Sequence, residues 1–176
     1  PKPDAQFEVD YPVAIIEHAT INFTNLTPLV DIFNWDFADG FTSTEENPQH
    51  TFTSINKFPV TLIVESEFGC KDTGMMEIEI LPFNVYTPNA FRPDSDIDEN
   101  REFMPVGVGV DANDFQLQIY NRWGEVIFES NSPDHKWDGT TKNNQPAPMG
   151  NNIWKADFAD IQGFKHSMKG QIMLIR

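Results

Sequence analysis

Cysteine, basic residues and long apolar runs are all scarce in this 176-residue sequence. The single cysteine, Cys70, excludes an internal disulfide and a zinc site built from cysteines. Apolar runs such as residues 13–16 are far shorter than the ~20 residues that a membrane-spanning helix needs. The 12 basic residues stand against 27 acidic ones, for a net charge of −15, which argues against a partner bound through its phosphate backbone.

Familiar catalytic motifs are also missing. The sequence has no Gly-x-Ser-x-Gly elbow, no His-Glu-x-x-His helix and no Walker loop. Residues 107–112 match a loose dinucleotide fingerprint, but no helix is expected after them, so they are predicted to form a glycine-rich loop. The four histidines are scattered without metal-ligand spacing, and no pair among the many carboxylates stands out. The sequence therefore predicts a chain without catalytic activity.

What the sequence has in quantity is aromatic and turn-forming residues. Fifteen Phe, four Trp and three Tyr provide material for packed cores, and 13 Pro and ten Gly provide turns. Helical periodicity is almost absent, and short alternating runs recur, which indicates an all-β sandwich or barrel. Strands are expected within residues 19–25, 32–37, 60–67, 75–80, 115–120, 126–128, 153–158 and 171–175.

The distribution of charge divides the chain. Residues 1–82 hold 14 acids and three lysines, whereas residues 83–176 hold 13 acids and nine bases. A strand-like run over 75–80 ends at Pro82, where we place a boundary between two domains, 1–82 and 83–176. The start, Pro1-Lys2-Pro3-Asp4, lacks the features of a signal peptide and predicts a linker within a longer protein.

A nearly twenty-residue motif marks the first half: Asn34-Trp35-Asp36-Phe37-Ala38-Asp39-Gly40, then Ser43-Thr44, then Asn47-Pro48-Gln49-His50-Thr51-Phe52. This motif resembles the signature of the PKD domain. The resemblance implies an immunoglobulin-like β-sandwich over residues 1–82, used as a spacer or adhesion unit of extracellular proteins. It also implies structural roles for the motif residues Trp35, Asp36, Asp39, Gly40 and His50.

Elementary chemistry agrees with a structural role for these residues. Phe33, Trp35 and Phe37 alternate along one strand and so would fill the space between two sheets. Asp36 and Asp39 precede Gly40, where carboxylates accept backbone N–H groups in a tight turn.

Three stretches mark the second half: Tyr86 to Pro93, with Phe103-Met104-Pro105 after an acidic loop; Phe115 to Phe128, with Trp137-Asp138-Gly139; and Gly150 to Trp154, with Gly170 to Arg176. Together they resemble the gliding-motility-associated C-terminal domain of Bacteroidetes, the type B sorting domain of the type IX secretion system. The resemblance covers residues 83–176 and implies a second β-sandwich in tandem with the first. It implies that sorting depends on Asn89, Phe91, Asn121, Arg122, Trp123, Gly124, Trp137, Asp138, Gly139, Gly150 and Arg176.

The aromatic and basic members of this set also have plainer interpretations. Trp123 and Trp137 are more commonly core or turn-packing residues than ligand platforms. Arg122 could cover an aromatic ring or pair with a carboxylate. Asn152 stands where the family has an aromatic residue, which we interpret as a tolerated surface change.

The acidic loop of the second half is a candidate metal site. Asp94, Asp96, Asp98 and Asn100 present oxygen ligands at every second residue, a spacing that could surround one calcium ion. The loop is not an EF-hand, because Glu99 and Pro105 occupy positions where Gly and Glu are required. A solvated acidic loop without a metal is the alternative, and the sequence leaves both open.

The predicted function follows from the two resemblances. They imply a non-catalytic, extracellular C-terminal region of a cell-surface adhesin that directs type IX secretion and attachment at the outer membrane surface in gliding motility. The implied partners are the type IX secretion translocon and outer-membrane shuttle or anchoring proteins. One alternative is the spacer and sorting tail of a secreted polysaccharide hydrolase or protease. Another is a glycan-binding module with exposed aromatics such as Trp154 as stacking platforms.

Overall fold

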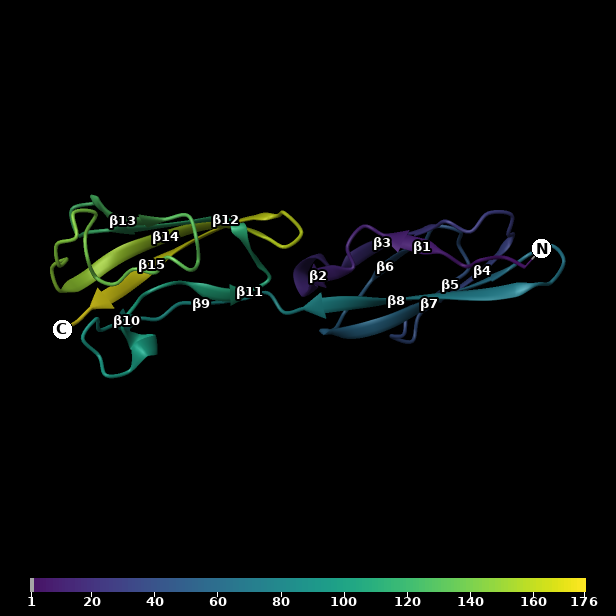
Figure 1. Ribbon diagram of the computed structural model, residues 1–176, viewed down its shortest axis with the longest axis horizontal. Coiled ribbons are helices and arrows are strands. Elements are labelled where there is room, and N and C mark those ends of the chain that lie inside the picture. The colour runs from purple at the N-terminus through teal and green to yellow at the C-terminus, as the bar shows by residue number, and fades with distance from the viewer. Residues whose placement is uncertain (1) are drawn as a thin grey trace. The chain divides into compact units, whose positions relative to one another are not determined.

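A computed structural model describes residues 2–176; Pro1, the first residue of the predicted linker, lies outside the described residues (Figure 1). The chain forms two compact units, one ending at Pro82 and one spanning Phe83–Arg176, hereafter the first and second unit. Each unit has its own hydrophobic core between sheets. Strands make up most of both units, so the predicted all-β class is confirmed.

The first unit is a sandwich of a three-stranded and a five-stranded sheet (Figure 1). In spatial order the smaller sheet contains β1 (Phe7–Val9), β3 (Thr20–Asn25) and β6 (Gln49–Thr51). The larger sheet contains β2 (Val13–Ile15), β8 (Lys71–Leu81), β7 (Asn56–Glu65), β4 (Ile32–Asp36) and β5 (Thr42–Ser43). All pairs are antiparallel except β2 with β8, and the 3₁₀ turn η1 (Ile16–His18) follows β2.

Alternation along β4 fills the core of the first unit. Phe33, Trp35 and Phe37 are all buried, as the sequence predicts, while the residues between them face outward. Trp35 is only 1% exposed, and its indole N–H donates to the carbonyl oxygen of Glu45 at 2.9 Å. Its polar edge is thus satisfied inside the sandwich.

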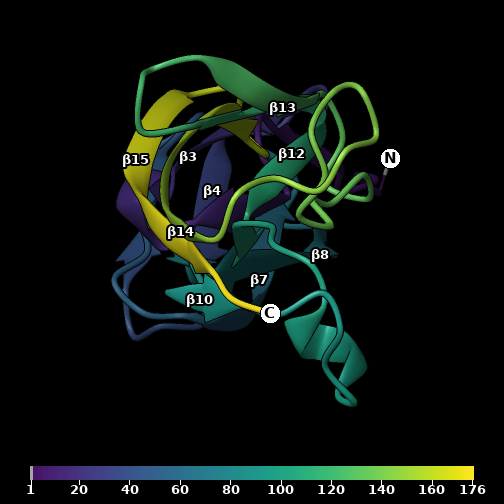
Figure 2. The ribbon, with the colours of Figure 1, turned by 90° about the vertical axis from the view of Figure 1, so that its left-hand side faces the viewer.

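The second unit is built around another five-stranded sheet (Figures 1 and 2). Its spatial order is β10 (Ala90–Phe91), β15 (Lys165–Leu174), β14 (Gly150–Asp160), β12 (Val110–Tyr120) and β13 (Val126–Ser130). A two-stranded sheet pairs β9 (Asn84–Tyr86) with β11 (Val106–Val108), and the 3₁₀ turn η2 (Asp98–Asn100) lies in the acidic loop. The pair β10–β15 is parallel and the other pairs are antiparallel.

The predicted glycine-rich loop over 107–112 is wrong. Val106–Val108 is β11 and Val110 begins β12, with only Gly109 between them, at a φ of +82° that favours glycine. Gly107 lies inside β11, where an added Cβ would meet the carbonyl oxygen of Asn84 at 2.5 Å. The glycines therefore permit close strand pairing rather than a loop.

Candidate functional site at one end of the second unit

The sheet topology brings distant parts of the second unit to one end. β12 and β15 finish there, and β13 and β14 begin there, because Tyr120 pairs with Ile153 and Gly150 pairs with Leu174. Phe91 of β10 also pairs with Leu174. We call this region the motif end; it contains the predicted sorting residues Asn89, Phe91, Asn121, Arg122, Trp123, Gly124, Trp137, Asp138, Gly139, Gly150 and Arg176.

The turn between β12 and β13 is held by one asparagine side chain. The Oδ1 atom of Asn121 accepts the backbone N–H groups of Trp123 at 2.9 Å and Glu125 at 3.0 Å. Its amide group donates to the Glu125 carboxylate at 2.7 Å. Gly124 adopts a φ of +82° with no atom near the position of a Cβ, so glycine is needed there for conformation rather than for space.

This turn displays two side chains to solvent. Trp123 is 70% exposed, and the Arg122 guanidinium lies over its ring with 5.4 Å between Cζ and the ring centroid. An added Cβ at Gly150 would lie 3.6 Å from the Arg122 guanidinium, so Arg122 also borders the start of β14. Trp123 is therefore a surface residue and not part of the core.

Trp137, by contrast, is completely buried. Its indole N–H donates to the Thr140 carbonyl oxygen at 2.8 Å, and its ring lies 5.0 Å from that of Phe91. Asp138 accepts both the backbone N–H and the hydroxyl of Thr140, which fixes the turn after the tryptophan. Gly139 has a φ of +83°, and an added Cβ would meet the Pro93 side chain at 2.9 Å.

The last residues of the chain close the motif end. The Arg176 guanidinium donates to the carbonyl oxygens of Ala147 at 2.8 Å and Gly139 at 3.1 Å. Three residues earlier, the N–H of Met173 donates to the Asn89 carbonyl oxygen at 3.0 Å. Sequence reasoning identified Arg176 but missed Ala147, because an acceptor that is a backbone carbonyl leaves no side-chain signal.

The PKD motif residues lie inside or just above the core of the first unit. Asp36 accepts the N–H of Ala38 at 2.9 Å, and Asp39 accepts that of Phe41 at 3.2 Å, as expected for carboxylates before Gly40. Asp39 also pairs with His50 Nε2 at 2.7 Å. The His50 ring stacks on Phe37 with 4.1 Å between centroids. The set binds one turn to the three-stranded sheet, with Asp39 and His50 engaged with each other.

The candidate calcium residues are not brought together. Asp94 forms an ion pair with Arg92 at 2.9 Å, and Asp98 forms one with Arg101 at 2.9 Å. The arginine is the main reason that the pKa of Asp94 lies below its usual value. Across residues 2–176, no group of three or more Asp, Glu, His or Cys side chains is placed to hold a metal. The two alternatives drawn from the sequence, a calcium site and a solvated acidic loop, both stay untested.

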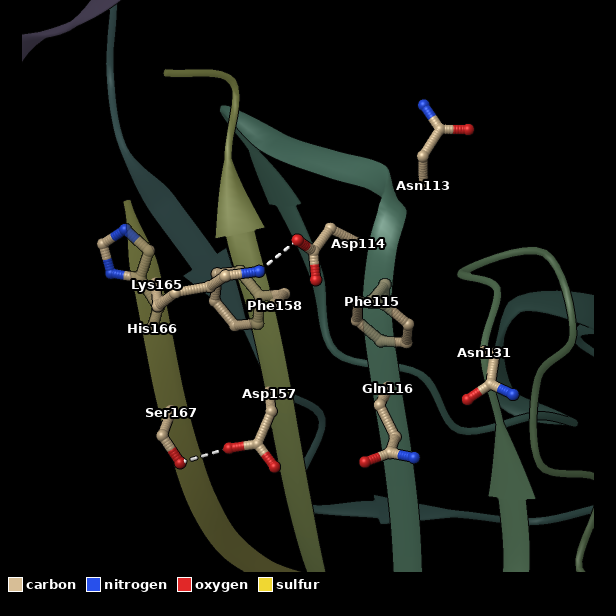
Figure 3. Close-up of a pocket in the computed structure, with 10 residues that line it drawn as sticks. All are labelled: Asn113, Asp114, Phe115, Gln116, Asn131, Asp157, Phe158, Lys165, His166 and Ser167. Atoms are coloured by element: carbon tan, nitrogen blue, oxygen red, sulfur yellow. Dashed lines mark hydrogen bonds and ion pairs between the residues drawn. The ribbon is translucent and has the colours of Figure 1, made fainter. Parts of the chain in front are cut away.

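A second candidate site is a shallow hollow of about 520 Å³ over the outer face of β12, β14 and β15 (Figure 3). Its charged groups are already paired: Lys165 with Asp114, and Asp157 with Ser167 and Lys155. The hydrogen bond from Lys155, followed by that from Ser167, lowers the pKa of Asp157. These partners leave the hollow no carboxyl group prepared for acid–base work.

Two predictions about surface residues are wrong. Trp154, the suggested glycan platform, is only 3% exposed and packs against Phe103 and the backbone of Gly170. Asn152 is 4% exposed rather than a surface residue, and its amide donates to the Gly150 carbonyl oxygen at 3.2 Å. Both residues lie on the side of β14 that faces the core, because side chains at even-numbered positions of this strand point inward.

Sequence patterns did not predict that Asp160, at the opposite end of β14, is a buried acid. Asp160 is fully buried and accepts hydrogen bonds from His166 Nε2 and from the N–H groups of Gln162 and Phe164. Burial acts to raise the pKa of this carboxyl, but these hydrogen bonds outweigh it and hold the pKa below its usual value. The His166 ring stacks on Phe83, the first residue of the unit.

Comparisons with known proteins match both units. The family model of the CHU_C type IX secretion signal domain matches residues 85–174, and that of a PKD domain matches residues 2–80. Both kinds of domain are non-catalytic modules. No helix in the described part of the chain has the length and apolar character needed to cross a membrane.

Solved structures similar to this chain include two PKD domains. The PKD1 domain from the Vibrio cholerae metalloprotease PrtV is 30% identical, covers 46% of this chain and 98% of its own, and has a TM-score of 0.40. The PKD1 domain of Vibrio anguillarum Epp is 21% identical, with 47% and 96% covered and a TM-score of 0.41. The fibronectin(III)-like modules of Clostridium thermocellum CbhA are 11% identical, with 97% and 93% covered and a TM-score of 0.44.

Proposed function

We propose that the motif end is the surface through which this chain is recognised for export. The premise is that the chain belongs to the type IX secretion signal domain family and carries a PKD domain before it. The two domains support a sorting region of a secreted protein. A type IX secretion signal implies interaction with the secretion machinery, and a cell-surface or extracellular location.

The observation that carries the proposal is the exposed pair Arg122–Trp123 on a turn fixed by Asn121. A tryptophan has few rotatable bonds, so burying it against a partner gains apolar contact at little entropic cost. The adjacent guanidinium supplies donors for carboxylate or carbonyl groups of the partner. A fixed turn also reduces the ordering cost of binding.

The other motif residues support this surface indirectly. Arg176 fastens the end of the chain to the loop over 137–147, in which Trp137 and Gly139 are buried. Gly150 borders Arg122 and pairs with Leu174, so displacement at the chain's end would reach the displayed turn. Under this proposal the translocon and the shuttle or anchoring proteins at the outer membrane read a folded shape rather than a linear signal.

We further propose that the parent protein is a cell-surface adhesin used in gliding, with the PKD unit as a spacer. In support, the PKD motif residues of the first unit are spent on its core and turns. Sequencing upstream of residue 1 tests this part: repeated PKD-like units would support the adhesin, and a catalytic signature would support a secreted hydrolase or protease instead.

The recognition surface is tested by fusing residues 83–176 to a fluorescent passenger in a strain with a type IX system. The wild-type fusion should reach the surface or medium, and Arg122→Ala with Trp123→Ala should leave it inside the cell. Tyr86→Ala is the matched control, because Tyr86 is another aromatic of this unit that is 65% exposed and is not among the predicted sorting residues. Equal export of all three fusions, with each purified domain folded, would exclude the motif end as the recognition surface.

A further inference from the structure

One edge of the second unit's sheet is open for most of its length. β15 lies next to β10, but β10 pairs only with Met173 and Leu174 (Figures 1 and 2). The N–H groups of Met173 and Ile175 donate outward, to Asn89 and Phe91. Since outward groups alternate along an antiparallel strand, Ser167, Lys169 and Gln171 also direct their backbone N–H and C=O groups away from β14. Within residues 2–176, no backbone group pairs with that side of these three residues.

Two other strands of the molecule carry a covering contact. In the second unit, the N–H of Lys142 donates to the Ile127 carbonyl oxygen and covers β13. In the first unit, Ala5 lies against β8, where its carbonyl oxygen would be 2.7 Å from a Cβ on Gly74. An unprotected edge offers a row of donors and acceptors to another extended chain. The open stretch of β15, residues 165–171, is therefore a candidate docking edge.

The side chains along this edge specify the chemistry of what would dock. Lys165 and Lys169 lie on the outer face of the sheet, and both are exposed. Lys169 stands directly opposite Lys155 on β14, an arrangement of like charges that is unfavourable by itself. Asp157 is engaged by Lys155, and Lys169 has no ion pair among the described residues. The outer face therefore lacks one negative charge beside Lys169.

The inner side of the same edge is apolar. Met168 packs partly against the core of the unit, and Gly170 lies against the Trp154 ring, which an added Cβ would meet at 2.8 Å. A strand added at this edge would present alternate side chains to the two faces. Acidic residues would lie opposite Lys169, which has no ion pair among the described residues, and beside Lys165, which already pairs with Asp114. Apolar residues would lie opposite Met168 and Gly170.

We propose that the β15 edge over residues 165–171 binds an extended segment of a partner protein in which acidic and apolar residues alternate. The segment adds to the sheet through the backbone of Ser167, Lys169 and Gln171. Its acidic residues supply the charge that Lys169 lacks. The site is separate from the motif end, and its occupation is a further binding activity of the second unit.

A second copy of the chain fits the edge less well. Antiparallel pairing of two β15 edges would bring the lysines of both copies together, which opposes self-association. The same two lysines favour an acidic strand over a basic or neutral one. They thus select the partner and disfavour pairing between two copies.

The test uses the full chain and a capped seven-residue peptide of alternating valine and glutamate, with a valine–lysine peptide as control. Titration calorimetry should detect binding of the glutamate peptide alone. Amide resonances of residues 167–171 should shift on binding. Lys165→Glu with Lys169→Glu should reverse the preference, weakening the glutamate peptide by about tenfold or more and admitting the lysine peptide. Lys169→Glu relieves the Lys155–Lys169 repulsion, whereas Lys165→Glu breaks the Lys165–Asp114 pair, so the melting temperature of the double variant is measured alongside its binding.

A backbone variant separates strand addition from simple charge attraction. Gln171→Pro removes an outward N–H while leaving the ladder to β14, since its N–H does not donate to that strand. It should weaken the glutamate peptide with little change in melting temperature. Peptide binding that is unchanged in both variants would overturn the proposal, as would concentration-dependent dimers of the wild-type chain dispersed by the lysine variants. Export of the double lysine variant should remain normal, which keeps this test distinct from that of the motif end.

Discussion

The two units use their signature residues in different ways. In the first unit the motif tryptophan Trp35 is 1% exposed, and the motif acids bind backbone N–H groups of their own turn. In the second unit one motif tryptophan, Trp137, is equally buried, but the other, Trp123, is 70% exposed beside Arg122. Under the proposed function the first unit needs only its fold, whereas the second must also present a surface. Trp137 contributes to the fold, and Trp123 is the residue that would contribute to such a surface.

Both units contain a His–Asp pair, but the carboxylate is buried to different degrees in the two pairs. Each closes a turn with a His–Asp pair whose imidazole stacks on a phenylalanine: His50 with Asp39, and His166 with Asp160. The side chain of Asp39 retains 12% exposure, while that of Asp160 is fully buried. A buried carboxylate depends on its hydrogen bonds much more than an exposed one. The second unit is thus the one whose stability should respond to the loss of its acid.

The largest effect should come from emptying either core. Trp35→Ala and Trp137→Ala should each cost about 3–5 kcal/mol, because each removes a fully buried indole. Each should unfold its own unit and leave the other folded, since the cores are separate. Urea titration followed by NMR resonances assigned to each unit measures both transitions. Simultaneous loss of both units from either substitution would contradict the proposed boundary at residue 82.

Two glycines of the second unit allow the cost of a positive φ to be separated from the cost of a steric clash. Gly139→Ala should cost about 3 kcal/mol, because a Cβ there adds a clash with Pro93 and Leu174 to the strain of a positive φ. Gly124→Ala should cost only about 1 kcal/mol, because its φ is the same but its surroundings are empty. Chemical denaturation of the two variants gives the comparison. Equal losses would show that packing around Gly139 does not matter for the fold.

The Asp160 pair predicts how the second unit responds to acid. The pKa of Asp160 is lowered in the folded state, so its stabilisation is complete above the ordinary carboxyl pKa of about 3.9 and is lost as the pH falls through the folded value. Asp160→Asn should cost about 2 kcal/mol at neutral pH and flatten the acid side of the stability profile. Thermal melts from pH 7 down to pH 3 measure it. Asp39→Asn, which removes the partner of His50, is the matched control and should leave the profile of the second unit unchanged.

Sequence patterns found the buried centres of the strands and missed their polar extensions. The run over 171–175 predicted the end of β15, but residues 165–170 continue the strand with two lysines, a serine and a glycine. Pairing with β14 fixes those residues as strand, and no local pattern reports that pairing. The short edge strands β1, β5, β6 and β10 escaped for the same reason, since two or three residues carry no periodicity.

The candidate site was predictable in its members and not in its arrangement. Motif residues such as Trp123 and Arg176 were identified from the family resemblance, but only the register Gly150–Leu174 shows that they share one end of a sheet. Exposure was the least predictable property. Trp123, Trp137 and Trp154 are the same residue type, and only the first is exposed.

The smallest effect is expected from calcium, at the acidic loop of the second unit. Arg92 and Arg101 already neutralise Asp94 and Asp98, so a cation would have to displace two ion pairs before gaining those ligands. Millimolar calcium should therefore leave the melting temperature of the second unit unchanged, because a ligand stabilises a fold only where it binds it. Differential scanning calorimetry with calcium and with a chelator makes the comparison, using Asp96→Asn with Asp98→Asn as the control. A rise in melting temperature with calcium that this double variant abolishes would instead establish the loop as a calcium site.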